Sequence, residues 1–99
     1  MITRIVKLEF EDLHIHVFMD IFTEHALMME SVPGCMSLEL VQDVLHPKTL
    51  FTISIWQREE DLESYRTSEL FNIVWSKIKP LFAARPFAWT TQSIYHGKN

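Results

Sequence analysis

The sequence predicts a single α+β domain, and three observations support this fold class. Its 99 residues fit one domain, which we expect to cover residues 1–99 with a core at about residues 2–95. Apolar residues make up 47% of the chain, against only 2 glycines and 4 prolines, which argues against a disordered protein. Segments with strand-like and helix-like hydrophobic periods follow one another as strand, helix, strand, strand, helix, strand. This βαββαβ order is the split βαβ, or ferredoxin-like, arrangement, in which helices cover one face of a four-stranded antiparallel sheet.

The N-terminal part of the chain is predicted to form a strand and then a long helix. Residues 2–10 alternate β-branched and polar side chains, as in a strand with one buried face. Asp12 can cap the following helix through its carboxylate. Apolar side chains at spacings of three and four indicate the helix, which should end near Val32. These side chains are Phe18, Ile21, Phe22, Met28 and Met29. Pro33-Gly34 then breaks the helix, with the glycine free to take a positive φ.

A hairpin is predicted for the middle of the chain. Apolar and polar side chains alternate in residues 36–43 and again in residues 50–57. The intervening turn is expected around His46-Pro47-Lys48.

Two helical segments and a closing strand complete the predicted domain. Glu59-Glu60-Asp61 favours a helix start, because negative charge complements the exposed amides of the first turn, and this helix should reach about Tyr65. Ser68 can cap a second segment, which Pro80 should kink or end. The apolar stripe of that segment has helical spacing and consists of Phe71, Val74, Trp75, Ile78 and Phe82. Residues 86–95 are rich in aromatic and β-branched side chains, which is typical of a strand.

Charge and hydropathy limit the classes of partner. The chain has 9 Lys and Arg against 13 Asp and Glu, and no basic cluster, so we expect no binding to nucleic acid. Uninterrupted apolar runs are far shorter than the roughly 20 residues of a membrane-spanning helix. The N-terminal residues lack the apolar block of a secretory signal, and the single cysteine excludes an internal disulfide. We therefore expect a soluble cytoplasmic protein with no membrane partner.

The sheet face opposite the helices is predicted to form a homodimer. Its positions include large apolar side chains, which would not remain in water in a monomer of ~100 residues. Two such sheets packed face to face with two-fold symmetry bury these side chains. The predicted partner is therefore a second copy of the chain, bound through the open sheet face.

Four segments resemble the antibiotic biosynthesis monooxygenase (ABM) domain family of dimeric α/β-barrel proteins. They are PGCMSLEL at 33–40, FTISIW at 51–56, EDLESY at 60–65 and SELF at 68–71. The resemblance covers nearly the whole chain and implies a ferredoxin-like dimer with a pocket between helices and sheet in each subunit. It also implies oxygenation of electron-rich aromatic substrates by O₂ without metal or flavin. Other relatives degrade haem or modify small signalling molecules.

The family resemblance singles out Tyr65. Many members carry a histidine in the helix that follows the strand tryptophan, and Tyr65 stands at that position here. The haem-degrading branch has a tryptophan there, a histidine where Trp75 stands here, and an asparagine on the first strand. Because the first strand here contains no asparagine, the resemblance disfavours haem degradation.

His25 and Tyr65 are the candidate catalytic residues. Cofactor-free oxygenation needs a base or hydrogen-bond partner, an aromatic-lined pocket and exclusion of water. His25 lies on the apolar stripe of the first helix, where its neutral imidazole can accept a phenolic proton; the alternative is a buried histidine satisfied by a backbone carbonyl. The hydroxyl of Tyr65 can orient a substrate oxygen or stabilise an anion; the alternative is a packed ring with its hydroxyl in water.

The candidate substrate-binding residues are mostly aromatic: Trp75, Phe71, Trp56, Phe22 and Arg66. Each aromatic side chain has a core-packing alternative, and Trp56 in particular is a candidate packing anchor. Thr52 and Ser54 alternate with the apolar residues of the same strand and, being small, leave space above the sheet. Arg66 can meet an anionic substrate or lie in solvent.

We expect no bound metal or cofactor, with O₂ as the co-substrate. His14 and His16 have a metal-ligand spacing on a strand, but on the predicted helix they diverge and have no evident third ligand. Cys35 is interpreted as a small buried residue.

These observations predict a cofactor-independent monooxygenase that oxidises a small electron-rich aromatic compound, such as a quinol, anthrone or phenol. Two alternatives stay open. One is a non-catalytic dimer that binds a small ligand. The other is an isomerase- or hydrolase-like enzyme that acts on a small signalling molecule without oxygen.

Overall fold

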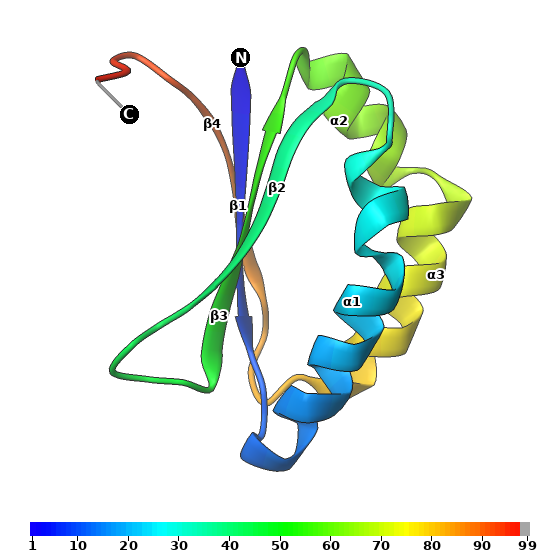
Figure 1. Ribbon diagram of the computed structural model, residues 1–99, viewed down its shortest axis with the longest axis vertical. Helices are drawn as coiled ribbons and strands as arrows, with labels where there is room; N and C mark the ends of the chain where they lie inside the picture. The colour runs from blue at the N-terminus through cyan, green and yellow to red at the C-terminus, as the bar shows by residue number, and fades with distance from the viewer. Residues whose placement is uncertain (98–99) are drawn as a thin grey trace.

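The computed structural model describes residues 1–97 and confirms the ferredoxin-like α+β fold (Figure 1). The strands are β1 (Ile2–Glu9), β2 (Cys35–Gln42), β3 (Thr49–Trp56) and β4 (Phe87–Gln92), and the α-helices are α1 (Ile15–Glu30), α2 (Glu59–Arg66) and α3 (Glu69–Ile78). Short 3₁₀ turns precede α1 at Asp12–His14 and follow α3 at Lys79–Leu81. The sheet has the antiparallel order β2-β3-β1-β4, with all three helices on one of its faces.

Capping residues, prolines and glycines in the sequence correctly predicted most of the boundaries of the helices and strands. The Ser68 hydroxyl oxygen accepts a hydrogen bond from the Phe71 amide at 3.2 Å, which confirms the predicted cap of α3. This helix ends at Ile78, two residues before Pro80. Gly34 has a φ of 88°, in the left-handed region that favours glycine, within the turn that separates α1 from β2.

Two boundary predictions are wrong. Asp12 does not cap α1: it starts a 3₁₀ turn, so α1 begins only at Ile15, and no side chain forms a cap there. The last strand ends at Gln92 rather than Tyr95. Gln92 pairs with Ile2, the first residue of β1, so residues 93–97 extend past the start of β1 and have no neighbouring strand to pair with.

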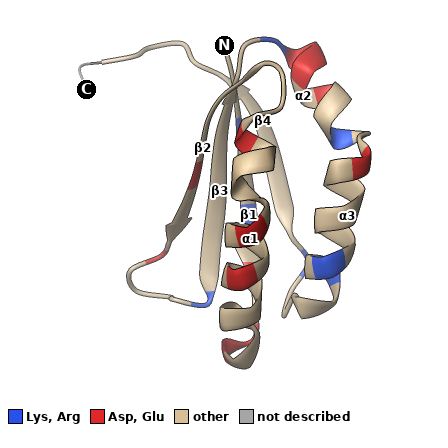
Figure 2. Cartoon of the chain, turned by 45° about the vertical axis from the view of Figure 1, so that its right-hand side comes forward, with Lys and Arg blue, Asp and Glu red and all other residues tan. Residues whose placement is uncertain are grey.

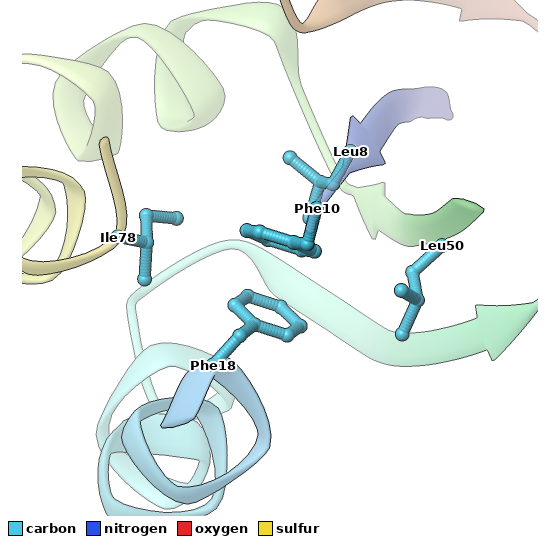
Figure 3. Packing of buried hydrophobic residues seen from close by; sticks show 5 residues of the cluster. All are labelled: Leu8, Phe10, Phe18, Leu50 and Ile78. Carbon is cyan, nitrogen blue, oxygen red and sulfur yellow. The ribbon is translucent and has the colours of Figure 1, made fainter. Parts of the chain in front are cut away.

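The hydrophobic core lies between the sheet and the first half of α1 (Figure 3). Phe10, at 0% exposure, lies at its centre, with its ring stacked on Phe18 and Phe82 at centroid distances of 4.4 and 5.2 Å. The cluster of buried residues consists of Leu8, Phe10, Phe18, Leu50 and Ile78. Because β1, β3, α1 and α3 all contribute to it, this cluster fixes the helices against the sheet.

The opposite face of the sheet is uncovered and largely apolar. Figure 1 shows no helix on this side of the strands. The strand register places Ile53, Ile5 and Trp89 in one row across it, beside Glu39. Trp89 and the neighbouring Phe87 remain about half exposed, at 47% and 55%. Large apolar side chains therefore do lie on this face, as the sequence predicts.

Acidic residues lie along α1 and in the first turn of α2, whereas Lys and Arg are scattered over several elements (Figure 2). Among residues 1–97, none of the helices has the length and apolar character needed to cross a membrane.

Candidate functional site

A cavity of about 380 Å³ lies between the helices and the sheet. It borders the hydrophobic core, from which Leu8, Phe18 and Ile78 reach its wall. We call it the central cavity. This volume is within the usual range of ligand pockets, roughly 300–1,000 Å³.

Small and polar side chains form the sheet floor of the central cavity. Ser54 lies on β3, opposite Arg4 of β1 and Leu38 of β2, and Thr52 lies two residues away on the same face. The indole Nε1 of Trp56 donates a hydrogen bond to the Ser54 hydroxyl oxygen at 2.9 Å. Short side chains at 52 and 54 therefore leave the space that the sequence predicts above the sheet.

Four aromatic rings form a continuous wall of the central cavity. Tyr65 stacks on Trp56 at a centroid distance of 5.4 Å and meets the edge of Phe71 at 5.3 Å. Phe71 in turn stacks on Trp75 at 5.7 Å. Phe22 of α1 lines the same cavity. The structure thus brings together all five predicted aromatic side chains, from β3, α1, α2 and α3.

Tyr65 is a hydrogen-bond donor at neutral pH. Burial raises its pKa to about 12, and the nearby Cys35 adds to the shift. The hydroxyl therefore stays protonated far above neutral pH. It can donate to a substrate oxygen, but it cannot serve there as a phenolate base.

The raised pKa of Tyr65 predicts a loss of stability in alkali. Below about pH 10 the residue is protonated in both the folded and the unfolded chain, so its contribution is fully present. Between about pH 10 and pH 12 only the unfolded chain releases this proton, which should lower the free energy of unfolding by about 2 kcal/mol. Urea titrations at several pH values should show this decline in the wild type and in Tyr95→Phe, whose hydroxyl is on an exposed ring. An equal decline in Tyr65→Phe would contradict the assignment.

Two guanidinium groups also reach the central cavity. Arg4 is half-buried, and its Nη1 donates a hydrogen bond to Thr90 Oγ1 at 2.6 Å. Arg66, the last residue of α2, is more exposed and pairs with Glu63 at 3.2 Å. Burial lowers the pKa of Arg4, the charge of Arg66 lowers it further, and Glu63 opposes the shift.

The sequence model of the antibiotic biosynthesis monooxygenase family matches residues 1–72. The chain belongs to this family. Solved structures of similar fold include an antibiotic biosynthesis monooxygenase (TM-score 0.88, 16% identity, covering 96% of this chain and 100% of that one). A conserved Methanosarcina mazei Go1 protein (0.87, 16%, 93% and 92%) and a Mycobacterium tuberculosis protein (0.88, 10%, 98% and 98%) are also similar. No curated protein matches the chain.

In this ABM-family protein, His25 does not line the central cavity. Its ring is 5% exposed and its Nδ1 lies 2.9 Å from the carbonyl oxygen of Ile21, one turn earlier in α1. The helical stripe places His25 on the correct face, but this hydrogen bond turns the ring back along its own helix. The structure therefore does not bring His25 and Tyr65 together, and it corrects the placement of His25 in the pocket.

His14 and Cys35 of this ABM-family protein lie in surroundings that indicate a structural role. His14 Nδ1 lies 3.3 Å from the carbonyl oxygen of Leu81. The described residues contain no group of three or more His, Cys, Asp or Glu side chains arranged to hold a metal ion. Cys35 lines the central cavity, and burial raises the pKa of its thiol, which keeps it protonated at neutral pH.

Sequence reasoning missed Arg4 in this ABM-family site. Ile2, Val6 and Leu8 share the face of β1 on which Arg4 lies, as their spacing of two requires. The signal in the sequence that identifies Arg4 is a single charged residue among the apolar residues of one strand face.

Proposed function

We propose that this ABM-family protein is a cofactor-independent monooxygenase that oxidises a small electron-rich aromatic compound, such as a quinol, anthrone or phenol, with O₂. The observation that carries the proposal is the central cavity, whose wall of four adjoining aromatic rings includes Tyr65, a half-buried hydrogen-bond donor. Aromatic walls bind a planar substrate and exclude water, and a hydrogen-bond donor among them orients its oxygen.

The proposed reaction needs no electron source other than the substrate. In an anthrone, the CH₂ group between the rings becomes C=O: one oxygen atom of O₂ is inserted, and the other leaves as water with both hydrogens. The reactive form is the substrate anion, because it gives up an electron to O₂ more readily than the neutral compound. Tyr65 donates a hydrogen bond to the anionic oxygen, which lowers the pKa of the bound substrate.

Oxygen uptake tests this function and the role of Tyr65. With metal-stripped protein and a panel of quinols and anthrones, we expect chelator-insensitive uptake above the autoxidation blank, matched by oxygenated product. Tyr65→Phe should lower kcat/KM about a hundredfold, because it removes one donor to the developing anion and keeps the ring. Tyr95→Phe, at an 87% exposed position, is the matched control and should retain full activity. Equal turnover by Tyr65→Phe would contradict the assigned role.

A second candidate function is that of a non-catalytic dimer that binds a small ligand. It is favoured by one observation: within residues 1–97, the side chains that line the central cavity include no carboxylate and no imidazole. An isomerase- or hydrolase-like reaction needs such a base or nucleophile, so the same observation counts against that alternative. Aromatic binding without oxygen uptake would support the ligand-binding dimer.

We also propose that the chain forms a homodimer through the open sheet face. Its accessible surface is 6920 Å², against roughly 5,900 Å² expected for a folded monomer of this mass. Trp89 and Phe87 contribute large apolar area to this excess. A two-fold contact between two such faces would remove both side chains from water.

A further inference from the structure

The central cavity presents positive charge to a ligand. Arg4 lies on its sheet floor, in register with Ser54 of β3 and Thr90 of β4. Arg66 reaches the cavity from the end of α2. Within residues 1–97, all other side chains that line the cavity are uncharged at neutral pH, including the Tyr65 phenol and the Cys35 thiol.

Arg4 has no carboxylate partner among the described residues. The ion pairs in residues 1–97 join other side chains, including Arg66 with Glu63. Within the part of the chain that the structure describes, the one side-chain hydrogen bond of Arg4 goes to Thr90, so several N–H donors of its guanidinium are available to a ligand. Burial and the neighbouring Arg66 both disfavour the Arg4 charge, as its lowered pKa indicates. A bound anion would offset both effects.

The absence of a base among the described lining residues points in the same direction. A neutral phenol that enters the central cavity meets no carboxylate or imidazole to accept its proton. A ligand that arrives already ionised needs no such group. The cavity is therefore suited to an anion more than to a neutral aromatic molecule.

Building on the proposed function, we infer that the substrate is an aromatic anion, either a carboxylate or an acidic phenol in its ionised form, and that Arg4 binds its anionic oxygen. Phe71 and Trp75 take the ring, and Arg66 adds positive charge from the more exposed side. Arg4 then fixes the orientation of the substrate, with its apolar part against the aromatic wall.

Binding of two matched probes tests this inference without any reliance on turnover. Naphthoate and naphthamide, substituted at the same ring position, differ in charge but hardly in shape. By calorimetry at neutral pH, we expect the wild type to bind naphthoate about tenfold more tightly than naphthamide. Arg4→Gln should abolish this preference and leave the affinity for naphthamide unchanged, and Arg4→Lys should retain part of it. Arg58→Gln removes the same charge from an exposed arginine outside the cavity and should keep the full preference.

A nitrophenol distinguishes a phenolate site from a carboxylate site, because its visible absorbance reports the ionisation of the bound molecule. We expect the pKa of the bound nitrophenol to fall by about one unit in the wild type and to move most of the way back to its free value in Arg4→Gln, in which Tyr65 and Arg66 remain. A lowered pKa without naphthoate preference assigns the site to phenolates, and the reverse result assigns it to carboxylates.

Three outcomes would overturn the inference, and they separate it from the proposed function. Equal affinity for naphthoate and naphthamide, with no fall in the pKa of nitrophenol, would show an aromatic site that is indifferent to charge and leave the proposed function in place. A preference that survives in folded Arg4→Gln, with folding checked by circular dichroism, would remove Arg4 from the site. Failure of all three probes to bind the wild type would overturn both proposals.

Discussion

Phe10→Ala is expected to lower the free energy of unfolding by about 4 kcal/mol, the largest stability change of any substitution proposed for this chain. The Phe10 ring is 0% exposed and stacks on Phe18 and Phe82. Its removal costs both the transfer of the apolar side chain and the cavity that rigid neighbours cannot fill. Urea denaturation followed by circular dichroism measures the change.

Two further variants serve as controls for Phe10→Ala. Phe10→Leu keeps most of the apolar volume and should cost roughly 1–2 kcal/mol. Leu13→Ala, at a 75% exposed position nearby in sequence, should change the free energy of unfolding by less than about 0.5 kcal/mol. A loss below about 1 kcal/mol in Phe10→Ala would mean that Phe18 and Phe82 close over the vacated space, and would contradict a rigid core at this point.

The elements that depend on local chemistry could be predicted from the sequence. The Ser68 cap involves a hydroxyl and an amide three residues apart, so the chain itself brings the two groups together. The hairpin of β2 and β3 likewise joins segments that are adjacent in sequence. The prediction that Asp12 caps α1 was wrong because the local sequence pattern does not distinguish the start of an α-helix from a short 3₁₀ turn that precedes it. Asp12 is the first residue of that turn, and α1 begins at Ile15.

The site was only partly predictable because it depends on tertiary contacts. The aromatic wall was found because Phe71 and Trp75 lie on one helical stripe and Trp56 ends a strand. His25 lies on a similar stripe, but a hydrogen bond to its own helix decides where its ring points, and periodicity carries no information on that choice. Arg4 became a site residue only when β1 took the central position between β3 and β4 and its even-numbered residues faced the helices.

The sheet face that these helices leave bare leads to the prediction with the largest effect on assembly. Trp89→Glu should convert a homodimer of twice the 11.7 kDa chain mass into the single chain, as measured by sedimentation at micromolar concentration. Trp89 lies in one row with Ile5 and Ile53, so a carboxylate there would be buried against apolar side chains in a sheet-to-sheet contact. An unpaired buried carboxylate costs several kcal/mol, which exceeds what a contact of moderate size can tolerate.

A matched substitution on the helical layer separates loss of the interface from a general effect of added charge. Leu27→Glu places the same charge at a 74% exposed position of α1, on the layer opposite the open face, and should leave the dimer intact. A wild type that sediments as a single chain would contradict the proposed dimer, and equal dissociation by Leu27→Glu would move the interface to the helices.

If Trp89→Glu is monomeric and still binds naphthamide, the central cavity is complete within one chain. If dissociation abolishes that binding, the partner subunit is needed to close the cavity, since Phe87 contributes both to its lining and to the exposed surface beside Trp89.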